Sequence, residues 1–174
     1  RLVTVLRILS TDAINKAKSG HPGICLGAAP IVNALFYNVM NITPDNPDWM
    51  NRDRFILSAG HASALLYAVL YATTEDFTIE ELKKFRKMNS TTPGHPTLNL
   101  SKRIETTTGA LGQGFATAVG MAIAEKYLKN AVENHNVQQR AMAIVMDVNT
   151  GAIKAMAVEG GFDPIGIFFD AFDI

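Results

Sequence analysis

The first third of the chain alternates helical apolar patterns with turn-rich breaks. Residues 3–18 carry one apolar face at helical spacing, formed by Val3, Leu6, Leu9, Ala13 and Ala17, which predicts an amphipathic helix. Gly20 is predicted to end this helix, because glycine is common just beyond a helix terminus. Pro30 is predicted to open a second helix, because proline is tolerated at the first helical position.

The middle of the chain combines one strand pattern with two helical patterns. Residues 54–60, RFILSAG, form a short apolar run ending in glycine, which predicts a buried strand. A helix is expected next, with an apolar face made by Leu65, Leu66, Val69 and Leu70. Thr78-Ile-Glu-Glu81 is a capping box, which predicts a short helix reaching about Lys87. Residues 88–108 show no period and are expected to form a loop.

The last third changes character after Glu125. TTTGALGQG, residues 106–114, leads into a helix rich in Gly and Ala. Residues 126–140 predict a charged amphipathic helix, and MAIVMDVNTGAIKAMA, residues 142–157, predicts a β-hairpin. Alternating helix and strand signals favour an α/β layered domain. However, only one convincing strand precedes residue 141, which is fewer than an α/β sheet needs.

Composition narrows the class of protein. The 174 residues are 48% hydrophobic and suffice for one domain with a core. Lys plus Arg equals Asp plus Glu, at 16 each, which gives no electrostatic reason to expect a nucleic-acid partner. Cys25 is the only cysteine and is expected to be a buried structural thiol. With neither a signal-peptide pattern nor an apolar run approaching the ~20 residues of a membrane span, we expect no membrane association and a cytoplasmic location.

Three of the four histidines lie in loops that carry glycine or proline: His21 in SGHPG, His61 in AGH and His95 in PGHP. Imidazole donates or accepts hydrogen bonds near neutral pH, so three loop histidines can converge on one polar substrate. Two alternatives stay open at this point. The histidines can be unrelated turn residues, or they can bind zinc, although their spacing lacks the close ligand pairs of common zinc motifs.

Two further motifs have weaker chemical signals. GALGQG, residues 109–114, opens a helix, and helix amino termini attract anions. Its glycine order is neither the dinucleotide fingerprint nor a P-loop, so close helix packing explains it equally well. Asp147 follows an apolar strand pattern, where metal-binding carboxylates occur. Asp-Val-Asn-Thr-Gly is also ordinary hairpin-turn chemistry, and with no second ligand nearby we predict no metal ligand there.

Six motifs in order resemble the transketolase family: STDAINKAKSGHPG, NPDWMNRDRFILSAGH, EELKKFR, TPGHP, ETTTGALGQG and AVGMAIAEK. The resemblance covers residues 1 to about 125. It implies a partial thiamin diphosphate-binding fold, with helices around a short parallel sheet. The implied cofactors are thiamin diphosphate and Mg²⁺ or another divalent cation. The implied activity belongs to the pentose phosphate pathway and moves a two-carbon ketol unit from a ketose phosphate to an aldose phosphate.

The resemblance also assigns roles and partners. His21 and His95 are expected to contact the substrate as catalytic residues. Cofactor contacts are expected from His61, Gly109, Ala110 and Leu111. Sugar phosphates are the expected small-molecule partners, with a homodimer or a complementary C-terminal subunit as the expected assembly. Two positions depart from the family pattern, since Thr97 stands where Glu is common and Ala110 where Pro is common.

The last part of the chain contains the stretch EKYLKNAVENHNVQQRAMAIVMDVNTGAIKAMAVEGGFDP. From about residue 126 to residue 164, it resembles a different family, the start of the transpeptidase domain of penicillin-binding proteins. The Gly-Asp-Gly metal motif of transketolases is absent. We therefore expect two segments, a transketolase-like fragment over residues 1–125 and a transpeptidase-like helix and hairpin with an apolar tail over residues 126–174. The chain alone is expected to be inactive. Alternatives are a penicillin-binding transpeptidase fragment, a non-catalytic binding module and a zinc-binding protein.

Overall fold

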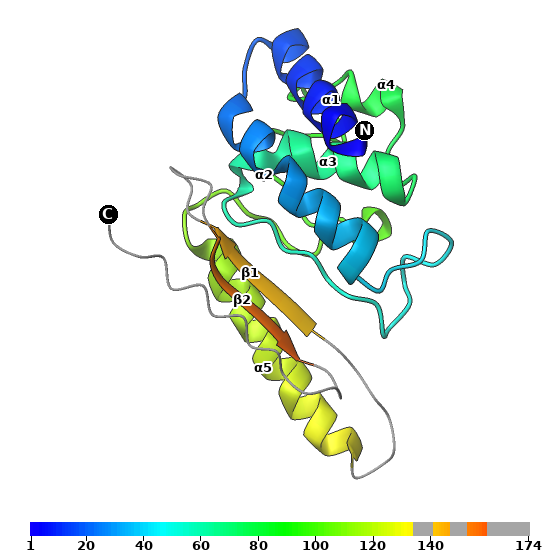
Figure 1. Cartoon of the computed structure of the whole chain (residues 1–174), viewed down its shortest axis with the longest axis vertical. Coiled ribbons are helices and arrows are strands. Elements are labelled where there is room, and N and C mark those ends of the chain that lie inside the picture. Colours follow the sequence, from blue (N-terminus) through cyan, green and yellow to red (C-terminus); the bar gives the residue numbers. More distant parts are fainter. Residues whose placement is uncertain (134–140, 147–152, 160–174) are drawn as a thin grey trace.

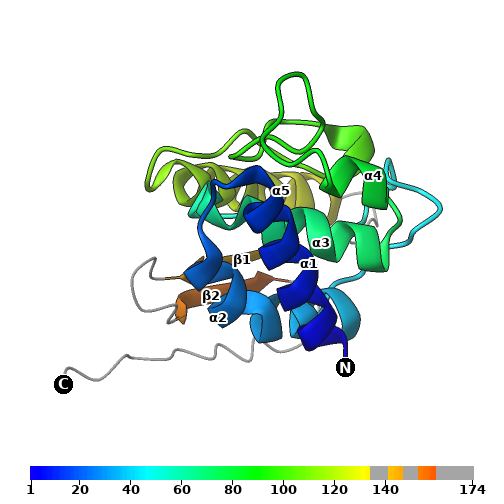
Figure 2. The same cartoon turned by 90° about the horizontal axis from the view of Figure 1, so that it is seen from above.

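The computed structural model describes residues 1–133, 141–146 and 153–159. A cluster of helices forms one part of the molecule, and a long helix with two strands alongside forms the other (Figures 1 and 2). The elements run in the order α1 (Leu2–Ala17), α2 (Pro22–Ala34), the π-helical turn η1 (Leu35–Val39), the 3₁₀ turn η2 (Gly60–Ala62), α3 (Ser63–Thr73), α4 (Ile79–Leu82), the 3₁₀ turn η3 (Leu100–Lys102), α5 (Gln113–Glu133), β1 (Ala141–Met146) and β2 (Ile153–Glu159).

Helix α3 is the centre of the helical cluster. Every residue from Ser63 to Leu70 is buried, as expected for a helix that is apolar on all sides. Helices α1 and α2 both pack against it. Tyr67 contacts the rings of Phe77 and Phe85, with centroid separations of 5.2 and 6.3 Å. The helix predicted from the apolar positions between Leu65 and Leu70 is therefore confirmed.

Helices α1 and α4 also follow their sequence signals. Helix α1 buries Leu6, Ala13 and Ile14 and ends at Ala17, where Lys18 is the C-cap in the left-handed conformation, so the helix stops before the predicted Gly20. The predicted capping box is formed at α4, where the Thr78 side chain and Glu81 bond to each other's backbone N–H. Helix α4 stops at Leu82 rather than near Lys87, and hydrogen-bonded turns follow it.

The prediction that Pro30 opens the second helix is wrong. Helix α2 begins at Pro22, and Pro30 lies inside it. A proline inside a helix has no N–H for the carbonyl four residues earlier, which here belongs to Leu26. Arg7 on α1 replaces that donor, since its Nε donates to the Leu26 carbonyl oxygen at 2.9 Å. The neighbouring helix thus makes an interior proline acceptable.

Cys25 on α2 is fully buried, as predicted, and burial raises the pKa of its thiol to about 11. Within the described residues, Pro22–Val39 is long and apolar enough to cross a membrane. That is weak evidence, because a core helix passes the same test. The buried residues of α2 (Cys25, Ala28, Ala29 and Val32) pack in the core.

The predicted strand at residues 54–60 is not formed. A strand requires a second strand with which to pair, and none of the described segments pairs with this one. Its Phe55 packs instead against Phe36 of the turn η1, with 5.2 Å between the ring centroids. The expected short parallel sheet is therefore not seen in the described parts of the chain, whose one sheet is the antiparallel pair β1–β2.

The predicted boundary near residue 125 is not a break in secondary structure. Helix α5 runs from Gln113 to Glu133 without interruption, and β1 lies along it (Figure 1). β1 pairs with β2 from Ala141↔Glu159 to Met146↔Ile153, with a register shift between Val145 and Met146. The remainder of the predicted helix, residues 134–140, and the predicted hairpin turn with Asp147 lie outside the described residues.

Two buried ion pairs hold the long loops against the helical cluster. Arg52 donates to both carboxylate oxygens of Glu105, at 2.5 and 3.2 Å, and both side chains are at most 5% exposed. Arg103 pairs with Asp76 and donates to the carbonyl oxygens of Thr43 and Pro44. The loop before residue 54 is thereby fixed to the loop that leads to α5.

Replacing Glu105 by glutamine should destabilise the protein by about 3–5 kcal/mol, because Arg52 is left buried without a countercharge. Urea unfolding followed by circular dichroism measures the change. The matched control is Glu80→Gln, which removes an exposed pair with Lys83 and should change stability very little. Equal effects from the two variants would contradict a structural role for the buried pair.

Candidate active site

His21 stands at the junction of α1 and α2. It is the N-cap residue of α2, and Pro22 occupies the first helical position. Lys18 closes α1, and the Ser19 backbone N–H bonds to the Ile14 carbonyl oxygen at 3.3 Å. The turn between the helices therefore places the His21 ring on an exposed surface beside the start of α2.

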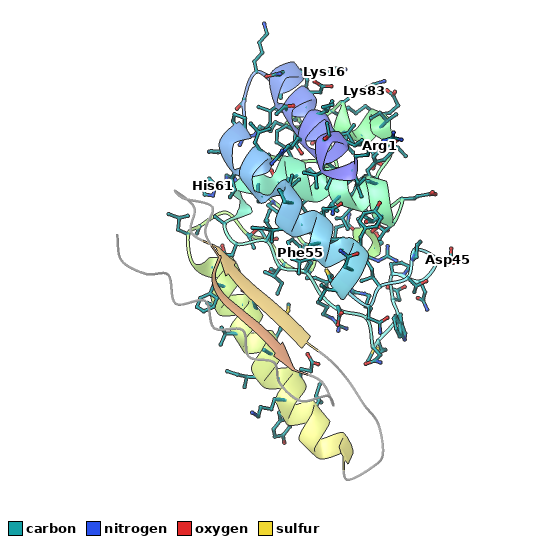
Figure 3. The ribbon with its side chains drawn as sticks, in the orientation of Figure 1. Arg1, Lys16, Asp45, Phe55, His61 and Lys83 are labelled. Atoms are coloured by element: carbon teal, nitrogen blue, oxygen red, sulfur yellow. The ribbon has the colours of Figure 1, made fainter. Side chains whose placement is uncertain are left out.

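His61 occupies the turn η2, just before α3. It is half-buried, and its Nδ1 is buried without a hydrogen-bond partner among the described groups. Figure 3 shows His61 at the edge of the helical cluster, towards the end of α5 that begins at Gln113. Because buried polar atoms are normally hydrogen bonded, the free Nδ1 is a position at which a bound molecule can supply a partner.

His95 lies in the loop between α4 and η3, directly beside Gly109. A Cβ added to Gly109 would lie 3.3 Å from Cγ of the His95 ring, so a larger residue at position 109 would press on the imidazole. The two segments are also joined by a backbone bond, from the Thr108 N–H to the Pro96 carbonyl oxygen at 3.0 Å.

The three histidines come together, with His61 in the middle. Its ring lies 4.8 Å from that of His21 and 5.1 Å from that of His95, centroid to centroid, and both contacts are edge to face. The interpretation of three unrelated turn histidines is therefore wrong. Partial burial, the neighbouring His61 and Arg86 lower the pKa of His21. The same causes, together with His21, lower the pKa of His95.

Two glycines bring the His61 turn against the start of α5. A Cβ on Gly60 would lie 2.6 Å from Oγ1 of Thr108, and one on Gly114 would lie 2.9 Å from Cβ of Ser58 and 3.0 Å from the Leu57 carbonyl oxygen. Close packing therefore accounts for at least one glycine of GALGQG. Thr108 Oγ1 is a second buried polar atom without a partner at this place.

The remaining predicted cofactor contacts are more open. Ala110 is exposed and Leu111 is 70% exposed. Both precede α5, whose first-turn amides have no intrahelical acceptors and favour an anion. The structure brings together His21, His61, His95 and Gly109, whereas Ala110 and Leu111 lie at the surface next to them.

Glu81 anchors the loop that carries His95. Its carboxylate accepts hydrogen bonds from Thr91 Oγ1 and pairs with Lys102, both at 2.8 Å, and its carbonyl oxygen accepts from Thr92. Burial raises the pKa of Glu81, but hydrogen bonds from Lys102, Thr78 and Thr91 outweigh it and lower the pKa to about 2. Glu81 is therefore ionised near neutral pH and holds Thr91, Thr92 and Lys102, which lie on either side of His95 in the sequence.

Three residues beside the histidines were not predicted from the sequence to belong to the site. They are Arg86, Ser19, whose hydroxyl accepts a hydrogen bond from Arg86, and Thr108, whose buried Oγ1 has no described partner. Arg86 lies in EELKKFR, one of the motifs that carry the family resemblance, but nothing in its spacing indicated a contact with the histidine loops. Thr108 lies in a threonine run that gave no reason to choose one residue.

No group of three His, Cys, Asp or Glu side chains is arranged to hold a metal ion within residues 1–133, 141–146 and 153–159. The described residues therefore do not support the zinc alternative. They do fit a polar ligand, because two buried atoms without partners, at His61 and Thr108, lie near the start of a long helix.

Comparison with known proteins gives a consistent result. The family profile "Transketolase, thiamine diphosphate binding domain" matches residues 1–154. The chain is 56% identical over 129 residues to a transketolase of Aquifex aeolicus, covering 74% of this chain and 19% of that protein. It is 44% identical over 181 residues to a probable transketolase of Streptococcus pneumoniae, covering 99% of this chain and 28% of that protein.

A solved transketolase from Leishmania mexicana superposes with a TM-score of 0.72 at 45% identity, over 75% of this chain and 19% of that one. The fold and sequence thus define a domain of the thiamin diphosphate-binding class. The chain belongs to the transketolase family, and it spans about a fifth of the length of the Aquifex relative.

Replacing Gly60 by alanine should destabilise the protein by about 1–3 kcal/mol, because the new methyl group overlaps the Thr108 side chain. Gly120→Ala is the matched control. It lies in α5, where no described atom outside the local helix backbone comes within 4 Å of the added Cβ. Alanine should stabilise a helix there by roughly 0.5–1 kcal/mol. Thermal unfolding distinguishes the two, and a neutral Gly60 variant would contradict the close packing.

The lowered pKa values of His21 and His95 predict that stability falls as the pH is reduced. The unfolded chain binds protons first, so stability is complete above the ordinary histidine pKa of about 6.5 and is lost as the pH falls from there through the lower folded values. Denaturant titrations between about pH 7.5 and about pH 5.5 test this. The double variant His21→Gln, His95→Gln should show a shallower dependence, and an unchanged slope would refute the assignment.

Proposed function

We propose that this chain binds thiamin diphosphate as part of a transketolase-type enzyme. The observation that carries the proposal is the convergence of three loop histidines beside the amino terminus of α5, with an unpartnered His61 Nδ1 between the other two. The cofactor, when bound, supplies an electron sink for a two-carbon carbanion. The enzyme would transfer that ketol unit from a ketose phosphate to an aldose phosphate.

Several residues beside the three histidines would contact the cofactor. His61 and Thr108 would bond the cofactor through their unpartnered atoms, and the first amides of α5 would face its diphosphate. Gly109 would bring its backbone close to the cofactor, since it has no side chain to press on the His95 imidazole. Ala110 and Leu111 would line the cofactor at the surface of the same loop.

His21 and His95 would act on the sugar. Because their pKa values are lowered, both rings are neutral near pH 7, and each then offers one donor and one acceptor nitrogen. A neutral imidazole can orient a substrate hydroxyl and move its proton. These roles are proposed for the assembled enzyme, together with sugar-phosphate substrates, a homodimer or a complementary C-terminal subunit, and a cytoplasmic location.

The divalent cation would need ligands beyond those described. The Gly-Asp-Gly motif of the family is absent from the sequence, and Asp147, which follows an apolar pattern at a similar distance, lies outside the described residues. We therefore propose that the isolated chain does not catalyse ketol transfer.

We also propose that residues 1–125 and 126–174 have different origins. The strong alignment to the Aquifex protein extends over 129 residues. Three observations stand against this: the family profile continues to residue 154, the match to the Streptococcus pneumoniae relative covers 99% of this chain, and the course of α5 is unbroken. Amplification across codons 120 to 135 from source DNA tests the join. A product with the same sequence establishes that the two segments are joined in the gene.

Calorimetric titration of the purified chain with thiamin diphosphate and Mg²⁺ tests the function. We expect a dissociation constant on the order of micromolar, and loss of binding in His61→Ala, because that change removes the central imidazole. Lys16→Ala is the control for non-specific attraction of the diphosphate, since Figure 3 shows Lys16 well away from His61.

The outcomes separate the alternatives. A folded chain that binds no thiamin diphosphate contradicts the proposal, and measurable ketol transfer by the chain alone contradicts its inactivity. Acylation by a labelled penicillin would favour the transpeptidase alternative.

A further inference from the structure

Arg86 contacts both loops that carry the outer histidines. Its Nη1 donates to Oγ of Ser19 at 2.7 Å, across 67 positions of sequence, and Ser19 lies two residues before His21. Its backbone N–H donates to the Thr92 carbonyl oxygen at 2.9 Å, within the loop that leads to His95. One residue thus joins the loop before α2 to the loop after α4.

The side chain of Arg86 is also enclosed by Gly94, the residue before His95. A Cβ on Gly94 would lie 2.8 Å from Nε of Arg86 and 3.1 Å from its Cζ. The Nε atom is buried and has no hydrogen-bond partner among the described groups. Gly94 therefore has no side chain at the position where the guanidinium passes.

The backbone of Arg86 is held in an uncommon conformation. Its φ is +59°, a left-handed value that residues other than glycine and asparagine seldom adopt. Such conformations persist where surrounding contacts determine them, and they gather at functional sites. Here the surrounding contacts are the bonds to Ser19 and Thr92 and the packing on Gly94.

Arg86 and His95 line the same open cleft, which has a volume of about 620 Å³ and is completed by Lys87, Met88, Pro93 and Gly94. The charged or titratable groups here are Arg86 and Lys87, with His95 and its neighbours His61 and His21. No carboxylate is among the lining residues.

We propose that Arg86 is a positioning residue of the active site, which fixes the His21 loop against the His95 loop and so sets how the two imidazoles face His61. What the positioned histidines bind rests on the proposed function, whereas the positioning role of Arg86 rests only on its contacts in the ligand-free chain. Arg86 acts on the histidines through Ser19, Thr92 and Gly94 and needs no contact with cofactor or substrate.

Nuclear magnetic resonance of the ligand-free chain tests the proposal. The imidazole signals are followed as the pH changes, and each signal is assigned by replacing one histidine at a time. A pH titration gives the midpoint at which each histidine is half protonated. In Arg86→Gln, we expect the titration midpoints of His21 and His95 to rise towards the ordinary histidine value, because a nearby positive charge is lost. We also expect the cross-peak between the rings of His21 and His61 to weaken, because the bond to Ser19 is lost.

Three further variants keep the test decisive. Arg86→Lys keeps the charge, so the midpoints should stay low while the ring cross-peak weakens. Ser19→Ala removes only the hydroxyl acceptor and should weaken the same cross-peak if Arg86→Gln fails to fold. Lys87→Gln removes the neighbouring cation of the same cleft and should change neither measurement.

Unchanged midpoints and an unchanged cross-peak in folded Arg86→Gln would overturn the proposal, as would an equal response to Lys87→Gln. These measurements use no ligand. A chain that binds no thiamin diphosphate would therefore still give an interpretable resonance result. Conversely, a negative resonance result would leave the calorimetric test of cofactor binding unaffected.

Discussion

The site depends on the close approach of the turn that carries His61 to the segment that leads into α5. Gly60 precedes the central histidine, and Gly114 lies in the first turn of α5. The space for a Cβ at either position is already taken by Thr108, Ser58 or Leu57. Neither position has room for a side chain, so these two segments can approach this closely only because both residues are glycine.

Partial burial and the charged groups around the site determine the protonation state of His21 and His95. Arg86 contributes positive charge near the histidines. No carboxylate that could stabilise a protonated imidazole is among the residues that line the cleft with His95. Both outer rings are therefore neutral near pH 7. A neutral ring can accept as well as donate a hydrogen bond, whereas a protonated ring can only donate.

The parts of the fold that could be predicted from sequence are those specified by neighbouring residues. The face of α1, the buried α3 and the capping box at Thr78 each depend on contacts within a few positions. Pro30 was misplaced because a proline at the start of a helix and one inside it look alike, and the donor that makes the difference, Arg7, lies 19 residues from Leu26.

The apolar run at residues 54–60 was taken for a strand because its pattern does not reveal whether a partner backbone lies beside it. Loop placement alone likewise left the three histidines open to several interpretations. Their assigned roles came from the ordered family motifs, and those motifs included Arg86 without giving it a role. Its bond to Ser19 joins positions that no local pattern connects.

The sole cysteine has a practical consequence for studying such a protein. Cys25 is fully buried on α2 and its thiol is hard to ionise, so reagents that attack thiolates find little to react with. A cysteine introduced on an exposed loop would then be the one site open to a spin label or fluorophore, with no need to remove the native residue first. The chain offers a ready background for measuring distances by spectroscopy.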